Sequence, residues 1–224
     1  VYHAKIDFFT NVAHEIRTPL TLINGPLENI LLKKTVDPEI REDLNIMKQN
    51  TERLLSLTNQ LLDFRKTESQ GFRLNFAECN VTEVLKETYN RFTSLARQRE
   101  LDFVLNVAEQ DFYAHVNKEA FTKIVSNLLN NAVKYAETYV HVFLEMNGIG
   151  EKRMFYIRTV NDGVIIPNEM KEEIFKPFVR FNEKEDGKVT TGTGIGLALS
   201  RSLAELHQGS LMMLEGEEAN VFCL

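Results

Sequence analysis

The residues best suited to chemistry lie near the start of the 224-residue chain, within FFTNVAHEIRTPL at residues 8–20. Glu15 can accept a hydrogen bond from the imidazole Nδ1–H of His14, which fixes the tautomer and leaves Nε2 as a free nucleophile. Thr18 lies one helical turn after His14, on the same face. Pro19 cannot donate a hydrogen bond to the carbonyl oxygen of Glu15, so we expect the helix to bend or loosen beside the histidine. This pattern predicts a nucleophilic histidine that a second domain can reach.

Two long helices are expected to present this histidine. In residues 1–34, apolar side chains recur at steps of three and four, at Ile6, Phe9, Ala13, Ile16, Leu20, Ile23, Leu27 and Ile30. Residues 38–67 repeat the pattern at Ile40, Leu44, Met47, Thr51, Leu54, Thr58 and Leu61. Both runs are heptad seams, and the short break between them predicts an antiparallel helical hairpin. In this register His14 falls outside the seam and is expected to face water.

The hairpin has more apolar residues than one partner helix can cover. The additional ones are Leu31, Leu55, Leu57, Leu62 and Phe64. A symmetric homodimer that forms a four-helix bundle would bury them. A hairpin packed against its own globular domain is the alternative. We expect residues 1–68 to form the first domain, which carries dimerisation and the reactive histidine.

The second domain, residues 69–224, mixes strands and helices. Alternating apolar residues predict strands at 72–76, 101–107, 112–116, 140–146 and 154–160, with a closing hairpin at 211–214 and 221–224. Helical periodicity predicts helices at 82–98, 118–135 and 194–207 and a helical piece at 168–175. Because these elements do not alternate strictly, we expect an α+β protein whose second domain is an α/β sandwich, with helices on one face of a mixed sheet.

One face of the helix at 118–135 carries Asn127, Asn131 and Lys134. Two amide oxygens one turn apart suit Mg²⁺, which prefers oxygen ligands and keeps waters and phosphates as further ligands. Lys134 supplies a point charge for phosphate. An ordinary polar helix surface is the alternative interpretation.

Glycines open the predicted helix at 194–207. Gly192, Gly194 and Gly196 alternate with other residues, so the backbone can approach a phosphate whose charge the helix N-terminus favours. Taken alone, this spacing is also typical of an ordinary tight turn. Together with the asparagine-rich helix, it predicts a site for a phosphoryl donor.

The bulk composition narrows the function classes. A net charge of −6 argues against a nucleic-acid surface, which requires clustered Lys and Arg. No apolar run approaches the roughly 18 residues that cross a bilayer. Cys79 and Cys223 are far apart and in no metal-binding spacing, which favours reduced thiols of a cytosolic protein.

The stretch from Phe9 to Leu20, with His14-Glu15-Ile16-Arg17-Thr18-Pro19, closely resembles the H-box of sensor histidine kinases. The resemblance implies that His14 is the phosphoacceptor and that Glu15 is the base that activates it. It also implies that Thr18 positions water when such an enzyme works in reverse as a phosphatase.

Two further stretches resemble the nucleotide-binding boxes of the same family. Residues 127–135 are similar to its N-box, which implies that Asn131 is the main Mg²⁺ ligand, that Asn127 supports it, and that Lys134 and Tyr135 contact phosphate and sugar. The G2 box is matched at Thr191, Gly192, Thr193, Gly194, Ile195, Gly196 and Leu197.

The segments around the G2 box also have counterparts in the family. Residues 183–190 are expected to form a mobile lid over the nucleotide. Phe175-Lys176-Pro177-Phe178 is similar to the F-box, whose aromatic side chains we expect to pack the base of the lid. Arg180 follows where relatives often place an arginine on the γ-phosphate; a surface salt bridge is the alternative.

The G1 box departs from the family pattern Asp-x-Gly-x-Gly-Ile. Alignment on Ile166 places Asn161 at the aspartate that accepts the adenine 6-amino hydrogen, Gly163 at the first glycine and Ile165 at the second. Asn161 retains a carbonyl acceptor but lacks the charge that strengthens such a bond, at a cost of about 1 kcal/mol. Asp162 is the alternative reader of the base, by a shift of one residue, although neighbouring side chains in an extended segment point oppositely.

The resemblance covers nearly the whole chain and implies a dimeric kinase core. With ATP and Mg²⁺ it would phosphorylate His14 and pass the phosphoryl group to an aspartate of a response-regulator receiver domain. The expected setting is the cytoplasmic segment of an inner-membrane sensor, and the altered G1 box resembles that of hybrid two-component sensors. A degenerate core acting as a signalling scaffold or phosphatase is the alternative. An ATPase or chaperone that shares only the nucleotide fold is opposed by the hairpin.

Overall fold

The computed structural model describes residues 2–32, 37–68, 73–148, 154–181, 193–214 and 218–224, with side chains from residue 16 onward. The chain divides into two compact units, residues 1–70 and residues 71–224. Each unit is described by itself.

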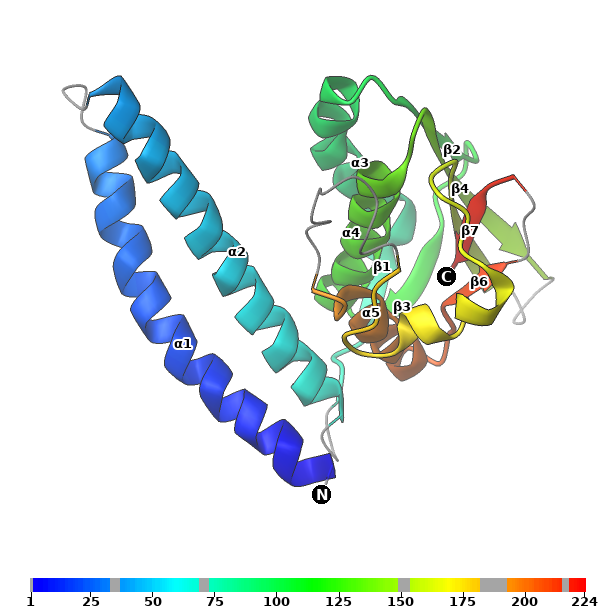
Figure 1. The fold of residues 1–224 in the computed structure, drawn as a ribbon. Helices are drawn as coiled ribbons and strands as arrows, with labels where there is room; N and C mark the ends of the chain where they lie inside the picture. The colour runs from blue at the N-terminus through cyan, green and yellow to red at the C-terminus, as the bar shows by residue number, and fades with distance from the viewer. Residues whose placement is uncertain (1, 33–36, 69–72, 149–153, 182–192, 215–217) are drawn as a thin grey trace. The chain divides into compact units, whose positions relative to one another are not determined.

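The first unit is a helical hairpin (Figure 1). Helix α1 (Tyr2–Leu31) runs without interruption through Pro19 and Pro26, and α2 (Pro38–Glu68) lies beside it in the opposite direction. Asp37 begins α2, because its Oδ1 accepts a hydrogen bond of 2.9 Å from the backbone N–H of Glu39. Arg41 then donates to the carbonyl oxygen of Leu31 at 2.9 Å, which ties the start of α2 to the end of α1.

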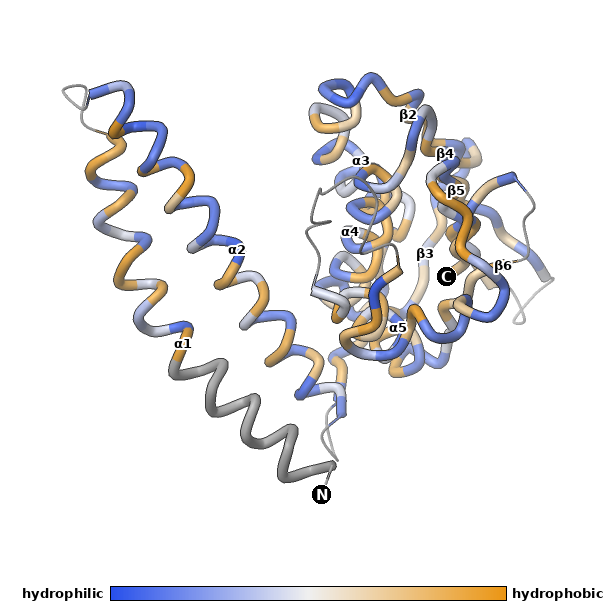
Figure 2. Tube along the Cα trace, viewed as in Figure 1, coloured by the Kyte–Doolittle hydropathy of each residue, from blue (hydrophilic) through white to orange (hydrophobic). Residues whose placement is uncertain are grey.

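The heptad seams divide between two faces of the hairpin, and Figure 2 shows their apolar residues recurring along both helices. Half of each seam lies between the helices, where the buried members are Leu20, Leu27, Thr51 and Thr58. The other half remains on the surface, with Ile16, Ile23 and Ile30 on α1 and Ile40, Met47 and Leu54 on α2, each at least 38% exposed. The hairpin therefore presents an apolar stripe of seam residues on each helix. The additional apolar residues that the sequence analysis assigned to a partner surface are not the exposed ones, because Leu62 is buried and Leu31, Leu55, Leu57 and Phe64 are half-buried.

The second unit is built on a five-stranded mixed sheet with the order β2-β4-β5-β7-β6. Its strands are β2 (Asp102–Val107), β4 (Tyr139–Asn147), β5 (Met154–Asn161), β6 (Met212–Leu214) and β7 (Asn220–Cys223). Strands β2 and β4 are parallel, and the remaining neighbours are antiparallel. A second, two-stranded sheet pairs β1 (Ala77–Asn80) with β3 (Tyr113–Val116).

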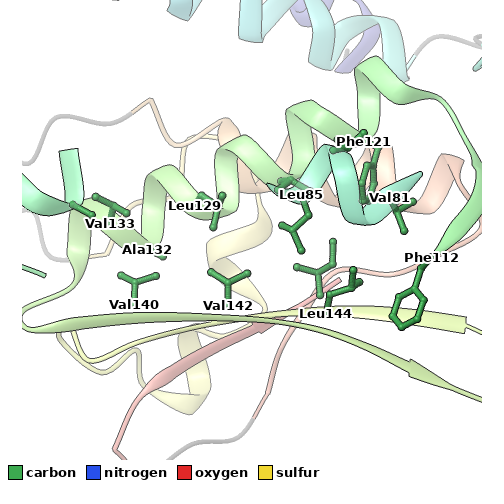
Figure 3. Packing of buried hydrophobic residues seen from close by; sticks show 14 of the residues in the cluster. Val81, Leu85, Phe112, Phe121, Leu129, Ala132, Val133, Val140, Val142 and Leu144 are labelled. Atoms are coloured by element: carbon green, nitrogen blue, oxygen red, sulfur yellow. The ribbon is translucent and has the colours of Figure 1, made fainter. Parts of the chain in front are cut away.

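Three helices cover one face of the large sheet (Figure 1): α3 (Val81–Gln98), α4 (Lys118–Tyr135) and α5 (Gly196–Leu206). Asparagine side chains cap the first two, since Asn80 accepts from the N–H of Glu83 at 3.0 Å and Asn117 from that of Ala120 at 2.9 Å. Figure 3 shows the core between α4 and the sheet, where the helix packs onto β4 through its apolar face. The fully enclosed side chains there include Leu85, Leu129, Val133, Val140 and Val142.

The predicted fold class is confirmed, with two long helices followed by a mixed sheet that has helices on one face. The strand expected at 72–76 is wrong as placed, because residues 73–76 have no strand structure and β1 lies at Ala77–Asn80. The helical piece expected at 168–175 is two short 3-10 turns, Asn168–Met170 and Glu173–Phe175. Among the helices of the described residues, none has both the length and the apolar character to cross a membrane.

Candidate nucleotide and phosphoacceptor sites

His14 and Glu15 lie in α1, where the structure describes their backbone but not their side chains. The side chain of Thr18, one turn later, is exposed. Arg17 between them donates a 2.6 Å hydrogen bond from Nη2 to Oδ1 of Asn59 on α2. This bond fixes the H-box turn of α1 against the facing helix. Sequence reasoning did not find Asn59, because it lies 42 residues further along the chain.

Asn127 is held between α4 and α5. Its Nδ2 donates to the hydroxyl of Ser200 on α5 at 3.0 Å. Its Oδ1 faces Gly196, where any Cβ would collide with the amide. Asn131 follows one turn later on α4 and is half-buried. A side chain at position 196 would therefore have to displace the Asn127 amide.

Lys134 and Tyr135 end α4 and contact each other. The Nζ of Lys134 lies 2.9 Å from the phenolic oxygen of Tyr135 and 4.5 Å from the centroid of its ring. The Tyr135 side chain is 43% exposed. The pair forms an accessible cationic and aromatic end to the helix face that begins with Asn127.

Arg99, which the sequence analysis did not single out, organises the same helix end. Its guanidinium donates to the carbonyl oxygens of Val133, of Lys134 at 2.6 Å and of Ala136 at 3.1 Å. The last carbonyl groups of a helix have no partner within the helix and carry partial negative charge. Arg99 therefore fixes the backbone from which Lys134 projects.

Asn161 ends β5 and is 3% exposed. Its Oδ1 accepts hydrogen bonds from the N–H of Gly163 at 3.3 Å and from Nδ2 of Asn220 on β7 at 3.5 Å. A Cβ at Gly163 would collide with the carbonyl oxygen of Tyr135, so this position must be glycine for the loop to lie against the end of α4. The Asn161 loop and the Lys134–Tyr135 helix end are thus adjacent.

Asn220 holds the remainder of this loop. Its Oδ1 accepts from the N–H of Ile166 at 3.0 Å, and its Nδ2 donates to the carbonyl oxygens of Gly163 at 3.1 Å and Val164 at 3.0 Å. Ile165, at the position of the second family glycine, is 39% exposed. Asn220 could not be identified from the sequence, because it lies 59 residues after Asn161, directly before the strand predicted at 221–224.

Asp162 points toward β4. Its carboxylate accepts hydrogen bonds from the backbone N–H groups of Glu137 and Thr138 at 3.0 Å and of Tyr139 at 3.1 Å, and from the hydroxyl of Thr138. Burial alone would raise the pKa of Asp162, but these four donors outweigh it and lower the pKa to about 2. Both carboxylate oxygens are engaged by the chain, which favours a structural role over the alternative that Asp162 reads a base.

The glycine-rich turn precedes α5. Gly194 has a φ of +69°, and a Cβ there would lie 2.8 Å from the Cα of Phe178. The carbonyl oxygen of Gly194 accepts a 2.8 Å bond from the N–H of Phe178, and Thr193 Oγ1 accepts from the N–H of Ile195 at 3.1 Å. The end of the F-box is thus hydrogen-bonded to the middle of the G2 box.

The other predicted members of this region are placed as follows. Ile195 is buried, and Leu197 and Arg180 are half-buried. Thr191 and Gly192 lie outside the described residues, as does the predicted lid at 183–190.

Helix α4 brings the predicted nucleotide residues together. The side-chain amide of Asn127 lies against Gly196, and the carbonyl oxygen of Tyr135 lies against Gly163. In the part of the chain that the structure describes, no three His, Cys, Asp or Glu side chains are grouped to hold a metal ion. The amides of Asn127 and Asn131, both half-buried, are the oxygen donors at the predicted positions on α4. Such a sparse set fits Mg²⁺ bound chiefly through ligand phosphates and water, which is the common arrangement for this ion.

A buried polar atom without a partner lies on the same strand face as Asn161. The hydroxyl of Thr159, two residues earlier on β5, is enclosed and makes no hydrogen bond to the described residues. Buried hydroxyls are normally satisfied by protein or water. Thr159 and Asn161 thus place two buried polar side chains next to each other on one face of β5.

Two known protein families match the two units of the chain. Residues 4–70 match the His Kinase A (phospho-acceptor) domain, and residues 116–221 match the Histidine kinase-, DNA gyrase B-, and HSP90-like ATPase family. Histidine kinase P4 of Formosa agariphila is 32% identical over 97% of this chain, which spans 16% of that protein's length.

Two solved structures extend the comparison. The crystal structure of full-length ShkA in complex with AMPPNP superimposes with a TM-score of 0.78 at 23% identity, covering 97% of this chain and 44% of that one. Histidine kinase ThkA, in complex with the response regulator protein TrrA, gives a TM-score of 0.63 at 26% identity, covering 97% and 60% of the two chains. The chain therefore belongs to the sensor histidine kinases and comprises their phospho-acceptor and ATPase-like domains.

Proposed function

We propose that the chain is the catalytic core of a two-component kinase that phosphorylates His14 from ATP and passes the phosphoryl group to an aspartate of a receiver domain. The observation that carries the proposal is the coexistence of two sites in one chain. An H-box lies on a helix of a domain that matches the phospho-acceptor family, and the predicted nucleotide residues converge along α4 in a domain that matches the ATPase family.

The residues of α1 supply the acceptor. Glu15 takes the Nδ1 proton of His14 as Nε2 forms its bond to the γ-phosphorus, and the bond from that phosphorus to the bridging oxygen breaks to release ADP. The Arg17–Asn59 bond keeps this turn of α1 in a fixed position against α2. Thr18 is exposed one turn later and would orient water in the reverse, phosphatase reaction.

The residues of the second unit supply the donor site. Asn131, supported by Asn127, would hold Mg²⁺; Lys134 and Arg180 would meet phosphate charge, and Tyr135 the sugar. Residues 191–197 would place backbone N–H groups near the phosphates. When bound, Mg²⁺ neutralises charge that develops on the transferred phosphoryl group. Asn161, Gly163 and Ile166 would surround the base, with Asp162 supporting the loop behind them.

We expect a homodimer in which two hairpins form a four-helix bundle. The support is the division of each heptad seam, which leaves Ile16, Ile23, Ile30, Met47 and Leu54 exposed at spacings of seven residues. Such spacing is the pattern of a second helical interface. Burial of these side chains by a second copy would remove a surface that is unfavourable in water.

The expected partner in phosphotransfer is a response-regulator receiver domain, on a separate protein or on the same parent chain. ThkA supports this expectation, because it is 26% identical and was solved with a response regulator. We also expect the chain to work in the cytoplasm as a segment of a membrane-bound sensor.

The proposal is tested by incubating the chain with γ-labelled ATP and Mg²⁺. We expect label on the wild type that is lost in acid and retained in base, as a phosphoimidazole requires. His14→Ala should take up no label, whereas the matched change His115→Ala, at an exposed histidine of β3, should behave as the wild type. Absence of acid-labile label from the wild type at high protein and ATP would contradict kinase activity and favour the scaffold alternative.

A further inference from the structure

Arg201 on α5 binds the segment that leads into the F-box. Its guanidinium donates to both carboxylate oxygens of Glu172, from Nη1 at 2.8 Å and from Nη2 at 3.2 Å. The central carbon of this guanidinium also lies 4.3 Å from the centroid of the Phe175 ring. Figure 1 shows the segment, in yellow, beside α5. We call these contacts the Arg201 bridge and residues 172–178 the F-box segment, which the bridge joins to α5.

The Arg201 bridge has features that an ordinary surface ion pair lacks. Isolated pairs at the surface contribute little to stability, because water competes for both charges and two long side chains must be ordered. The Arg201 side chain is instead 27% exposed and lies against Phe175, which is buried and contacts Phe222 of β7 edge-on. A planar guanidinium can bind both carboxylate oxygens while it stacks on an aromatic ring. The bridge therefore anchors the F-box segment to α5 and to the core.

The F-box segment ends in a left-handed backbone. Phe178 has a φ of +67°, which residues other than glycine seldom adopt, and it is 57% exposed. A residue keeps such a conformation only where the surrounding structure holds it there. The N–H of Phe178 donates to the carbonyl oxygen of Gly194 at 2.8 Å, and the Arg201 bridge holds the chain three residues earlier, at Phe175. Both contacts connect the F-box segment to the G2 box or to the helix that follows it.

We propose that Arg201 and Glu172 are positioning residues for phosphoryl transfer, because they set the position of Arg180 relative to the G2 box. The inference rests on the proposed function, in which Arg180 meets the phosphate charge of ATP. Arg180 follows Phe178 by two residues, so any movement of the F-box segment away from α5 displaces Arg180 from the glycine turn at residues 193–196. Arg201 acts through the segment rather than on the nucleotide, because its guanidinium is engaged by Glu172.

The difference between ATP and ADP gives the expected result. ATP carries the γ-phosphate that Arg180 is expected to meet, and ADP does not. Loss of the Arg201 bridge should therefore weaken the binding of ATP more than the binding of ADP. A bridge that only stabilised the fold would change both affinities by the same factor. The ratio of the two dissociation constants thus separates a positioning role from a structural one.

Glu172→Gln is the sharpest variant, because it keeps the shape of the side chain and removes its charge. Long-range electrostatics alone predicts tighter ATP binding when a negative charge is removed, so a simple charge effect and the Arg201 bridge predict opposite results. Calorimetric titration of the whole chain with Mg²⁺ and either nucleotide measures the two affinities. We expect the dissociation constant of ATP to rise about three- to tenfold and that of ADP to change by less than about twofold. Labelling of His14 at saturating ATP should slow by a similar factor.

Two comparisons complete the test. Glu173→Gln removes the same charge one residue later, where Glu173 pairs with Lys176 of its own segment, and should keep the wild-type ratio. The double change Arg201→Glu with Glu172→Arg restores opposite charges across the contact and should recover part of the ATP affinity that Arg201→Glu alone loses. ATP binding by Glu172→Gln as tight as that of the wild type, or an equal loss of ATP and ADP affinity, would overturn the inference and leave the kinase function standing. Failure of the wild type to bind either nucleotide would overturn both.

Discussion

Asp162 offers a direct test of how the loop after β5 is built. Its carboxylate accepts hydrogen bonds from three consecutive backbone N–H groups, those of Glu137, Thr138 and Tyr139, and from the Thr138 hydroxyl. Asp162→Asn keeps the size of the side chain but replaces one acceptor oxygen with a donor and removes the charge. We expect this change to destabilise the second unit without a comparable loss of nucleotide affinity.

The magnitude follows from the pKa of Asp162. The difference between its ordinary value of 3.8 and about 2 corresponds to at most about 2.5 kcal/mol of stability. Solvent screening at this half-buried position reduces the expected contribution to about 1–2 kcal/mol. Because the folded-state pKa is lowered, the contribution is fully present above about pH 4 and is lost as the pH falls toward 2.

Unfolding by urea, followed at pH 7 and at several values between pH 5 and 2, measures this contribution. The difference in free energy of unfolding between wild type and Asp162→Asn should be about 1–2 kcal/mol at pH 7 and should vanish near pH 2. Glu109→Gln, at an exposed carboxylate, is the matched control and should show little difference. A variant that keeps wild-type stability at pH 7 but loses nucleotide affinity would refute this reasoning and identify Asp162 as the reader of the base.

Three further changes test other contacts. Arg99→Lys should destabilise the second unit by about 1–3 kcal/mol in thermal unfolding, because one ammonium group cannot replace a planar guanidinium that donates to three carbonyl oxygens. An unchanged Tm would contradict this role. Gly196→Ala should lower nucleotide affinity in calorimetry, since its Cβ must displace the Asn127 amide; wild-type affinity would show that nucleotide binding does not depend on the position of this amide. Ile23→Glu should convert the dimer to a monomer, as measured by analytical ultracentrifugation, whereas Glu52→Gln, at an exposed polar position of α2, should leave it a dimer. A monomeric wild type would contradict the four-helix bundle.

The sequence predicted helices well where apolar residues recur at helical spacing and a capping residue marks the start of the helix. The expected helix at 118–135 is α4 residue for residue, since Asn117 caps its start. Periodicity predicted both helices of the hairpin, but it could not say which half of each seam lies inside. That division depends on how α1 and α2 are rotated against each other, and each half has the same spacing. The strand at 72–76 was misplaced because alternation is a local signal, whereas β1 is defined by its pairing with β3.

The candidate site was predictable only where motifs are contiguous. The residues that hold the motifs in place come from distant parts of the chain: Ser200 lies 73 residues from Asn127, and the Nε2 of His207 accepts from the N–H of Asn117 across 90 residues. Such contacts have no local pattern. The bonds that hold the loop after β5 have the same origin, because Asn220 begins a strand that the sequence predicted only as part of a closing hairpin.

The central claim, that His14 accepts the phosphoryl group, is tested most directly by locating the phosphate within the chain. After incubation with ATP and Mg²⁺, the protein is digested at neutral or alkaline pH and its peptides are sequenced by mass spectrometry under conditions that preserve phosphoimidazole. We predict a single phosphorylated site at His14, absent from His14→Ala. Phosphate on another residue, or on none while nucleotide remains bound, would contradict the assignment.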